Sequence, residues 1–200
     1  CSANSNGVFP YDSPANREDA IVQMLGNYDP DIIGMQEAGD GGASGILDWC
    51  SALNEDLKGT YSYRSLTDET GYKMDICRGL IIFYKKDRFT LLDSGAKGYS
   101  QPTNNKRCYQ WVKLRDNETG VELYVFNTHW TVDGKITLEE NEAIRTVEMQ
   151  ELADKIKSIA KDQHVFITGD FNSFYAPKNS MGDMVNITAL QRETGFVDAL

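Results

Sequence analysis

The spacing of apolar residues changes along the chain between a helical period and a period of two. Helical spacing follows Ser13-Pro14, where a hydroxyl and then a proline are typical of a helix start, and it ends at Tyr28. It recurs over residues 46–57. These two stretches predict amphipathic helices in the first third of the chain.

A third helix is predicted to be the longest. It begins with a capping box formed by Thr137 and Glu140. Its expected buried face consists of five aliphatic residues: Ile144, Val147, Leu152, Ile156 and Ile159. A short last helix is predicted to begin at Thr188 and to end at Gly195.

A period of two predicts the strands. It gives four strands in the middle of the chain, over residues 61–66, 79–85, 89–92 and 108–114. A hairpin turn at residues 116–120 leads to a fifth strand that ends near His129. Apolar runs after helices add strands that end at Glu37 and Asp170. Intermixed helices, hairpins and helix-to-strand units predict mixed sheets packed between helices, in a single α/β or α+β domain over residues 1–200.

Polar side chains stand where three of these strands end. Glu37 follows one apolar run, His129 follows the second, and Asp170 and Asn172 follow the third. Side chains alternate along an extended chain, so Asp170 and Asn172 are expected to face the same way. If the three strands are neighbours, all four side chains line one pocket.

Each of these residues also has an ordinary structural interpretation. Glu37 suits a salt-bridged carboxylate at a strand end, and His129 suits a core-edge imidazole bound to backbone. Asp170 and Asn172 suit an Asx-type turn. Their coincidence at three strand ends favours chemistry on a phosphate. There, His129 would donate to a phosphate oxygen or stabilise the transition state, Asp170 would orient or deprotonate water, and Asn172 would hold the phosphate or the metal-bound water.

Oxygen ligands in this set suit a hard divalent cation. Mg²⁺ or Mn²⁺ takes one or two carboxylates together with amide oxygens, water and substrate phosphate. Glu37, Asn4 and Asp170 supply such oxygens. The sequence therefore predicts a site for Mg²⁺ or Mn²⁺ formed by these three residues.

Composition and charge narrow the substrates. The chain has 200 residues, 40% of them apolar, and a net charge of −10. This charge counts against a generic nucleic-acid surface, which needs Lys and Arg to displace counterions from phosphates. It favours a small or lipid-derived phosphoester, or a short contact with nucleic acid.

Neither a membrane-spanning apolar run nor a signal peptide is visible, which predicts a soluble protein. The compartment stays open, because a secreted protein whose signal has been removed would look the same. Four cysteines, Cys1, Cys50, Cys77 and Cys108, lack the spacing of a zinc site. Cys77 and Cys108 flank a pair of strands and are candidates for a disulfide in an exported protein.

Three stretches resemble motifs of the endonuclease/exonuclease/phosphatase superfamily, which has the deoxyribonuclease I-like fold. They are residues 30–37 (PDIIGMQE), Asn127-Thr128-His129 and Gly169-Asp170-Phe171-Asn172. Their order and spacing fit, as do three further features: residues 79–92, Arg107 with Trp111, and Arg145. The similarity runs over nearly the whole chain. It implies a two-sheet β-sandwich flanked by helices and metal-dependent hydrolysis of a phosphodiester or phosphomonoester by water.

The resemblance also implies a role for each site residue. Glu37 would be the main metal ligand, and Asn4 (or its rival Asn6) the asparagine that ends the first strand. His129 would contact the scissile phosphate, Asp170 would act on the water or leaving group, and Asn172 would position the phosphate.

One departure from the family pattern concerns the end of the chain. The family closes with a strand and an Asp-His pair, whereas this sequence ends at residues 196–200, which resemble the segment before that pair. The first strand is also short. We therefore expect a domain truncated at both ends, poorly active or inactive as it stands. The alternatives are a non-catalytic relative that binds a phosphorylated ligand or a protein, and a structural domain without metal.

Overall fold

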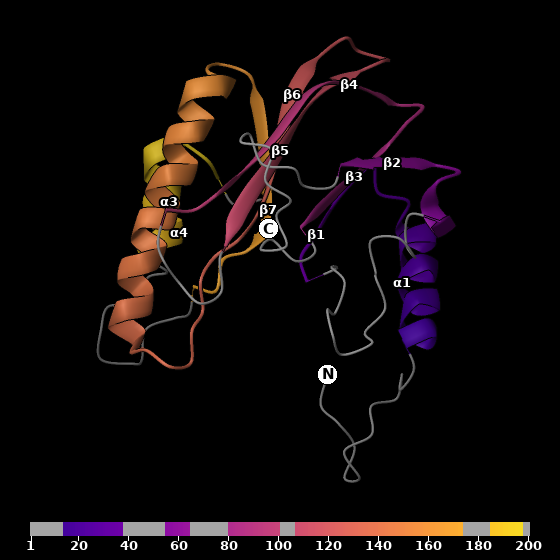
Figure 1. Ribbon diagram of the computed structural model, residues 1–200. Coiled ribbons are helices and arrows are strands. Elements are labelled where there is room, and N and C mark those ends of the chain that lie inside the picture. The colour runs from indigo at the N-terminus through magenta and orange to yellow at the C-terminus, as the bar shows by residue number, and fades with distance from the viewer. Residues whose placement is uncertain (1–13, 38–54, 65–79, 101–106, 174–184, 198–200) are drawn as a thin grey trace.

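The computed structural model describes residues 14–37, 55–64, 80–100, 107–173 and 185–197 (Figure 1). Seven strands and three helices have bounds within these ranges: α1 (Pro14–Tyr28), β1 (Ile32–Met35), β2 (Tyr61–Arg64), β3 (Ile81–Lys85), β4 (Phe89–Gly98), β5 (Cys108–Asp116), β6 (Glu122–His129), α3 (Leu138–Ala160), β7 (His164–Asp170) and α4 (Val185–Thr194). Residues 55–57 are also helical, and Leu57 is buried. The rest of the helix predicted over residues 46–57 lies outside the described residues.

The strands form two sheets that pack face to face. One sheet has the antiparallel order β1-β3-β2, and the other has the order β4-β5-β6-β7 with β6 and β7 parallel. Apolar side chains of both sheets fill the space between them: Ile82, Tyr84, Phe89, Val112, Leu114, Leu123 and Val125. This arrangement confirms the predicted two-sheet α/β fold.

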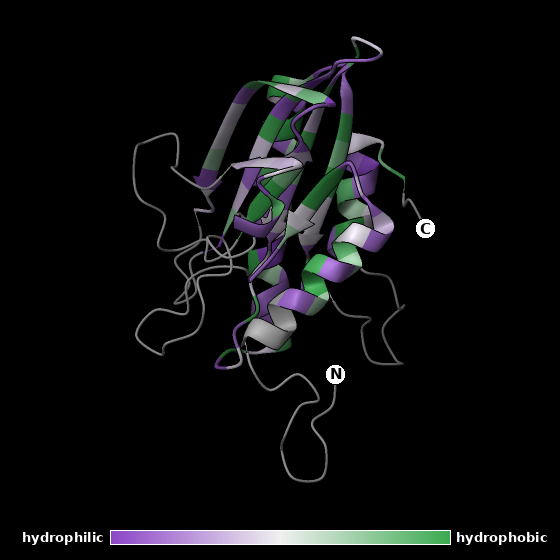
Figure 2. Ribbon diagram, turned by 90° about the vertical axis from the view of Figure 1, so that its right-hand side faces the viewer, coloured by the Kyte–Doolittle hydropathy of each residue, from purple (hydrophilic) through white to green (hydrophobic). Residues whose placement is uncertain are grey.

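Helices cover the outer faces of the sandwich. In Figure 1, α3 and α4 lie beside the four-stranded sheet, and α1 lies beside the three-stranded one. A second core joins α3 and α4 to their sheet, and a third joins α1 to β1, β2 and β3. Apolar residues mark the strands of both sheets in Figure 2. No helix in the described part of the chain is both long and apolar enough to cross a membrane.

β4 is longer than the strand predicted over residues 89–92. It pairs with β5 along its whole length, from Phe89 to Gly98. The register shifts between Leu91 and Asp93, where a bulge interrupts the alternation of side chains. A pattern read at strict period two stops at that bulge, although the strand continues.

The hairpin turn predicted at residues 116–120 is confirmed. Oδ1 of Asp116 accepts hydrogen bonds from the backbone N–H groups of Glu118 and Thr119. Gly120 then adopts a φ of +73°, a conformation that favours glycine.

The capping box of α3 is confirmed, but its predicted buried face is partly wrong. Thr137 and Glu140 exchange the two expected hydrogen bonds. Leu152 and Ile156 are buried, whereas Ile144, Val147 and Ile159 are only half-buried. Their place is taken by polar residues, among them Arg145 and Glu148, which are bonded to the loop after β6. Apolar periodicity alone cannot find a buried face that is partly charged.

α4 begins earlier than predicted and ends as expected. Its first residue is Val185 rather than Thr188. The first turn is held to α3 by Asn186, which is buried and hydrogen-bonded to Glu142 and Thr146. Gly195 follows the last turn with a φ of +76°.

Cys108, the first residue of β5, is disulfide-bonded. Cys77, its predicted partner, lies outside the described residues, so this pairing remains a prediction. Asn4 and Asn6 also lie outside them.

Candidate active site at the strand ends

The parallel pair β6 and β7 brings an imidazole and a carboxylate together. His129 is opposite Asp170 in the register, where both strands end. Nε2 of His129 lies 3.6 Å from Oδ2 of Asp170. The imidazole is 5% exposed and the carboxylate is open to solvent.

The end of β1 lies against the same place. A Cβ atom on Gly34 would stand 1.9 Å from Oγ1 of Thr168 in β7, so only glycine permits this approach of the two sheets. Gln36, which follows β1, donates a hydrogen bond of 2.7 Å to Asn127 of β6. Glu37 therefore directly follows Gln36, which is hydrogen-bonded to β6, the strand that carries His129.

Glu37 is exposed and adopts a φ of +56°. This left-handed conformation is uncommon for a residue with a Cβ atom, and such positions recur at functional sites. Its negative charge acts on both His129 and Arg107. The structure thus brings Glu37, His129 and Asp170 to one end of the sandwich, as predicted.

Arg107 fixes the orientation of His129. Its Nη1 donates to Nδ1 of His129 at 2.8 Å. The accepting nitrogen carries no proton, so in the neutral ring the proton is on Nε2, which faces Asp170. Burial, and next the charge of Arg107, lower the pKa of His129, while Asp170 and Glu37 act in the opposite direction. The ring is therefore a neutral donor at pH 7.

Sequence reasoning did not assign a role to Arg107. The residue precedes β5, whose first residue, Cys108, pairs with His129 in the sheet. Burial lowers the pKa of Arg107, and the carboxylates of Glu37, Glu148 and Asp170 oppose that shift. The useful signal was the register: a cation one residue before the strand partner of His129.

Asp170 and Asn172 form the Asx turn that was one of the two interpretations of this motif. The backbone N–H of Asn172 donates to Oδ1 of Asp170 at 2.9 Å. Asn172 has a φ of +44°, so the chain is no longer extended there. The predicted alternation assumed an extended chain through Asn172, and that premise is wrong. The Asn172 amide instead donates to the carbonyl of Trp130 at 2.8 Å, which attaches the turn to the end of β6.

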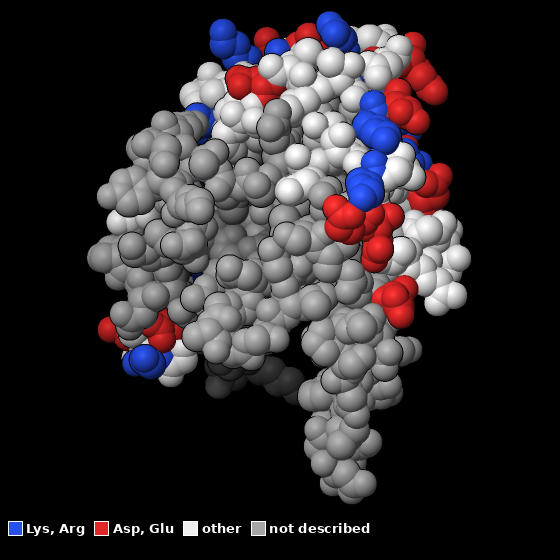
Figure 3. Space-filling model, turned by 45° about the vertical axis from the view of Figure 1, so that its right-hand side comes forward, with Lys and Arg blue, Asp and Glu red and all other residues white. Residues whose placement is uncertain are grey.

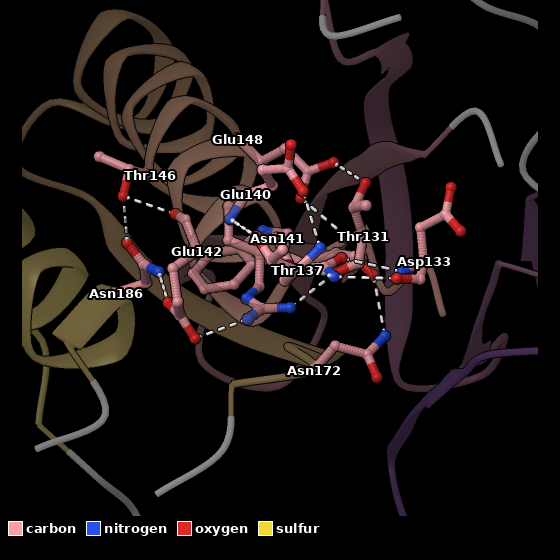
Figure 4. Close-up of polar contacts among 12 residues, drawn as sticks. Thr131, Asp133, Thr137, Glu140, Asn141, Glu142, Thr146, Glu148, Asn172 and Asn186 are labelled. Atoms are coloured by element: carbon pink, nitrogen blue, oxygen red, sulfur yellow. Dashed lines mark hydrogen bonds and ion pairs between the residues drawn. The ribbon is translucent and has the colours of Figure 1, made fainter. Parts of the chain in front are cut away.

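A buried polar network supports the chain just after His129 (Figure 4). Glu148 of α3 is 1% exposed and accepts hydrogen bonds from the backbone and hydroxyl of Thr131. Arg145, fully buried, donates to the Thr131 carbonyl at 2.9 Å and also bonds Glu142. Burial raises the pKa of Glu148, and the bonds from Thr131 offset part of that shift. The network holds Thr131, and with it the end of β6, against α3.

The donor set is compatible with a divalent cation. Glu37 and Asp170 offer carboxylate oxygens, a ligand type that Mg²⁺ and Mn²⁺ prefer, and Asn4, the third predicted ligand, lies outside the described residues. Within the described ranges no three His, Cys, Asp or Glu residues are grouped closely enough to hold a metal by themselves.

Comparisons with known proteins support the two-sheet fold. The profile of the endonuclease/exonuclease/phosphatase family matches residues 1–182. A crystal structure of a family member from Bacteroides vulgatus is 26% identical, with a TM-score of 0.65, over 84% of this chain and 63% of that one. No curated protein sequence matches the chain.

Two further solved structures are similar in fold. A mannosyl-6-phosphatase from Bacteroides thetaiotaomicron is 24% identical, with a TM-score of 0.64, over 81% of this chain and 58% of that one. The human Nocturnin catalytic domain, solved with a bound sulfate anion, is 19% identical, with a TM-score of 0.61, over 82% of this chain and 58% of that one. The chain thus spans less than two thirds of the length of these structures.

Proposed function

The chain belongs to the endonuclease/exonuclease/phosphatase family, and on that premise we propose that it takes part in metal-dependent hydrolysis of a phosphoester by direct attack of water. Members of this family are metal-dependent phosphoester hydrolases. The observation that carries the proposal is the meeting of His129 and Asp170, 3.6 Å apart, at the strand ends that Glu37 also reaches.

His129 acts as a neutral hydrogen-bond donor to the phosphate. Arg107 occupies Nδ1, so the Nε2–H group, which faces Asp170, is the one available to a ligand. A donor aimed at an oxygen that gains charge in the transition state stabilises that state more than the bound substrate. A buried, neutral imidazole keeps this proton at neutral pH.

Asp170 orients the attacking water and accepts its proton. One of its oxygens, Oδ1, is held by the N–H of Asn172, which leaves Oδ2 toward His129 and solvent. The Asn172 side chain, fixed through the Trp130 carbonyl, presents its Oδ1 atom at the same edge. Here Asn172 positions the phosphate.

Glu37 and Asp170, with Asn4, would hold Mg²⁺ or Mn²⁺. When bound, the cation offsets the negative charge of the phosphate as the bond breaks. The fold leaves the carboxylates of Glu37 and Asp170 accessible to such a cation.

The substrate proposed is a small or lipid-derived phosphoester rather than a long nucleic acid. The net charge of −10 opposes binding along many phosphates, since that requires a basic surface. On the face seen in Figure 3, the coloured basic side chains stand beside acidic ones. The name of the Bacteroides thetaiotaomicron relative, a mannosyl-6-phosphatase, agrees with a small substrate.

A substrate panel tests the proposal. Phosphomonoesters, including sugar phosphates, an aryl phosphodiester, single-stranded DNA and phospholipids are each incubated with the full-length protein in Mg²⁺, Mn²⁺ or chelator. We expect metal-dependent release of product from at least one small ester, and its loss in Glu37→Gln. Phosphate-ester binding without turnover would favour the non-catalytic alternative. Neither binding nor turnover, with no heat on titration with Mn²⁺, would leave only a structural role.

A further inference from the structure

Asn127 is the most completely bonded polar side chain among the described residues of the site. It is 0% exposed. Its Nδ2 donates to the carbonyls of Met35 and Ile81, at 2.8 and 3.0 Å. Its Oδ1 accepts from Gln36 Nε2 at 2.7 Å and from Thr168 Oγ1 at 3.1 Å. Both donors and both acceptor positions of the amide are therefore used.

These four bonds join both sheets at one end. Met35 and Ile81 are register partners at the end of β1 and the start of β3, in the three-stranded sheet. Thr168 belongs to β7 and is the register partner of Asn127 in the four-stranded sheet. One amide thus connects the two sheets close to the tight approach of Gly34 in β1 to Thr168 in β7.

The bonded residues stand at a constant offset from the proposed catalytic ones. Glu37 is two positions after Met35, His129 two after Asn127, and Asp170 two after Thr168. Along β6 and β7 this offset places both side chains on the same face of their strands as their bonded neighbours. The bonds to Asn127 therefore fix the points from which the three functional side chains project.

We propose that Asn127 is a positioning residue, which sets the separation of Glu37 from His129 and Asp170. The inference rests on the proposed function. An apolar side chain would fill the same space but form no directional bonds. A hydrogen-bonded amide specifies which carbonyls and hydroxyl lie opposite each other. A cation and a phosphate shared between residues of the two sheets require that relation to stay constant.

Two variants and one control test the proposal. Asn127→Ala removes all four bonds. Thr168→Val keeps the side-chain shape and removes one donor. Leu114→Ala is the control for lost stability, because Leu114 is fully buried in the core between the sheets. It lies far from the site, about 20 Å along β5 from Cys108, the strand partner of His129. Amide hydrogen exchange is followed in residues 35–37 and 168–172, and kcat and KM are measured on the substrate found in the panel.

For Asn127→Ala we expect faster exchange in both segments and a fall in kcat of about 100-fold, with KM changed far less. Thr168→Val should lower kcat roughly fivefold, as expected for one hydrogen bond. Leu114→Ala should leave kcat and the exchange of these segments near wild type. If Asn127→Ala does not fold, Thr168→Val decides by the same two measurements.

The outcomes separate this inference from the proposed function. A full-length wild type without turnover, in which Asn127→Ala still loosens both segments, would refute the function and keep the positioning role of the amide. An active wild type whose Asn127→Ala variant retains kcat within threefold of Leu114→Ala would overturn the inference. So would unchanged exchange at the strand ends.

Discussion

The two ends of the sandwich are held together by different chemistry. At the hairpin end, Arg88 bonds Asp31 at the start of β1 and lies 3.2 Å from Asp116 at the end of β5. Lys85 adds ion pairs with Asp29 and Asp31, at 2.9 and 3.2 Å. At the site end, the sheets are joined by the neutral, fully buried amide of Asn127.

Carboxylates are used differently at the two ends. Asp31 and Asp116 are occupied by Arg88. In the described part of the chain, neither Glu37 nor Asp170 has an ion pair with Lys or Arg, and Asp170 pairs only with His129. Joining the sheets with an amide leaves these carboxylates available to a ligand.

The pKa shifts favour the charged forms at the hairpin end and disfavour them at the site end. At the hairpin end, the pKa of Asp116 is lowered, chiefly by the N–H of Glu118, and the bond to Asp116 raises that of Arg88, so the charged forms are favoured. At the site end, burial lowers the pKa of both His129 and Arg107, so their charged forms are disfavoured. Such unfavourable burial of titratable groups is typical of functional sites.

The largest expected effect comes from removing the paired groups of the site. In the full-length protein, we expect His129→Ala and Asp170→Ala each to lower kcat by about two to four orders of magnitude, as for lost electrostatic stabilisation or proton transfer. His164→Ala, at the exposed start of β7, is the matched control and should retain full turnover. Turnover on the same ester and a thermal melt are measured for all three. Near-wild-type turnover in either site variant contradicts the assignment.

A smaller effect is expected where the sheets approach most closely. Gly34→Ala would place a Cβ atom 1.9 Å from Thr168 Oγ1, so a strand must shift. We expect a loss of about 1–3 kcal/mol in the free energy of unfolding, the usual result of overpacking, together with reduced turnover. Gly26→Ala, whose Cβ would meet nothing within 4 Å, is the control and should be neutral or stabilising. Urea denaturation of both variants measures the difference, and equal stability of Gly34→Ala and Gly26→Ala would contradict it.

The sequence was sufficient for the elements and for the three strand ends. Apolar runs that stop at a polar residue mark where a strand leaves the core, so Glu37, His129 and Asp170 were identifiable before any coordinates. A helix between two strands predicts parallel pairing, which is what aligns His129 with Asp170.

The bonds that make these positions a site were not predictable in the same way. Arg107 reaches His129 because of the register between β5 and β6, which no local pattern encodes. Asn127 gives no sign in the sequence of its hydrogen bonds, and only the packing of the two sheets gives it three of its four partners. The turn at Asn172 needed its φ of +44°, which an asparagine permits but does not require.

At the hairpin end, loss of charge should matter little. Arg88→Met removes the bonds to Asp31 and Asp116, but Asp116 retains two backbone donors. Because partly exposed ion pairs contribute little, we expect Tm to fall by about 2–4 °C or less and kcat to stay unchanged. Lys58→Met, which breaks the exposed pair with Glu55, should change neither. A kcat loss in Arg88→Met comparable to that of the site variants would show that the two ends are coupled.

The smallest expected effect is on the pH dependence of stability, which differs between the two ends. The pKa of His129 in the folded chain is below 6.5, owing first to burial and then to Arg107. Below pH 6.5 the unfolded chain therefore binds a proton that the folded chain resists, and stability falls as the pH is lowered. Asp116 behaves differently: its pKa lies below 3.8, so its contribution persists until the solution is more acidic than that. Burial raises the pKa of Glu148, so as the pH is lowered the folded chain takes up this proton before the unfolded chain does. This contribution to stability therefore opposes that of His129. Urea midpoints are measured in metal-free buffer between about pH 7.5 and 5. Comparing wild type with His129→Gln removes the contribution of Glu148, which both chains share. The wild-type midpoint should decline more steeply than that of the variant, and parallel curves would mean that the imidazole titrates alike in the folded and unfolded chains.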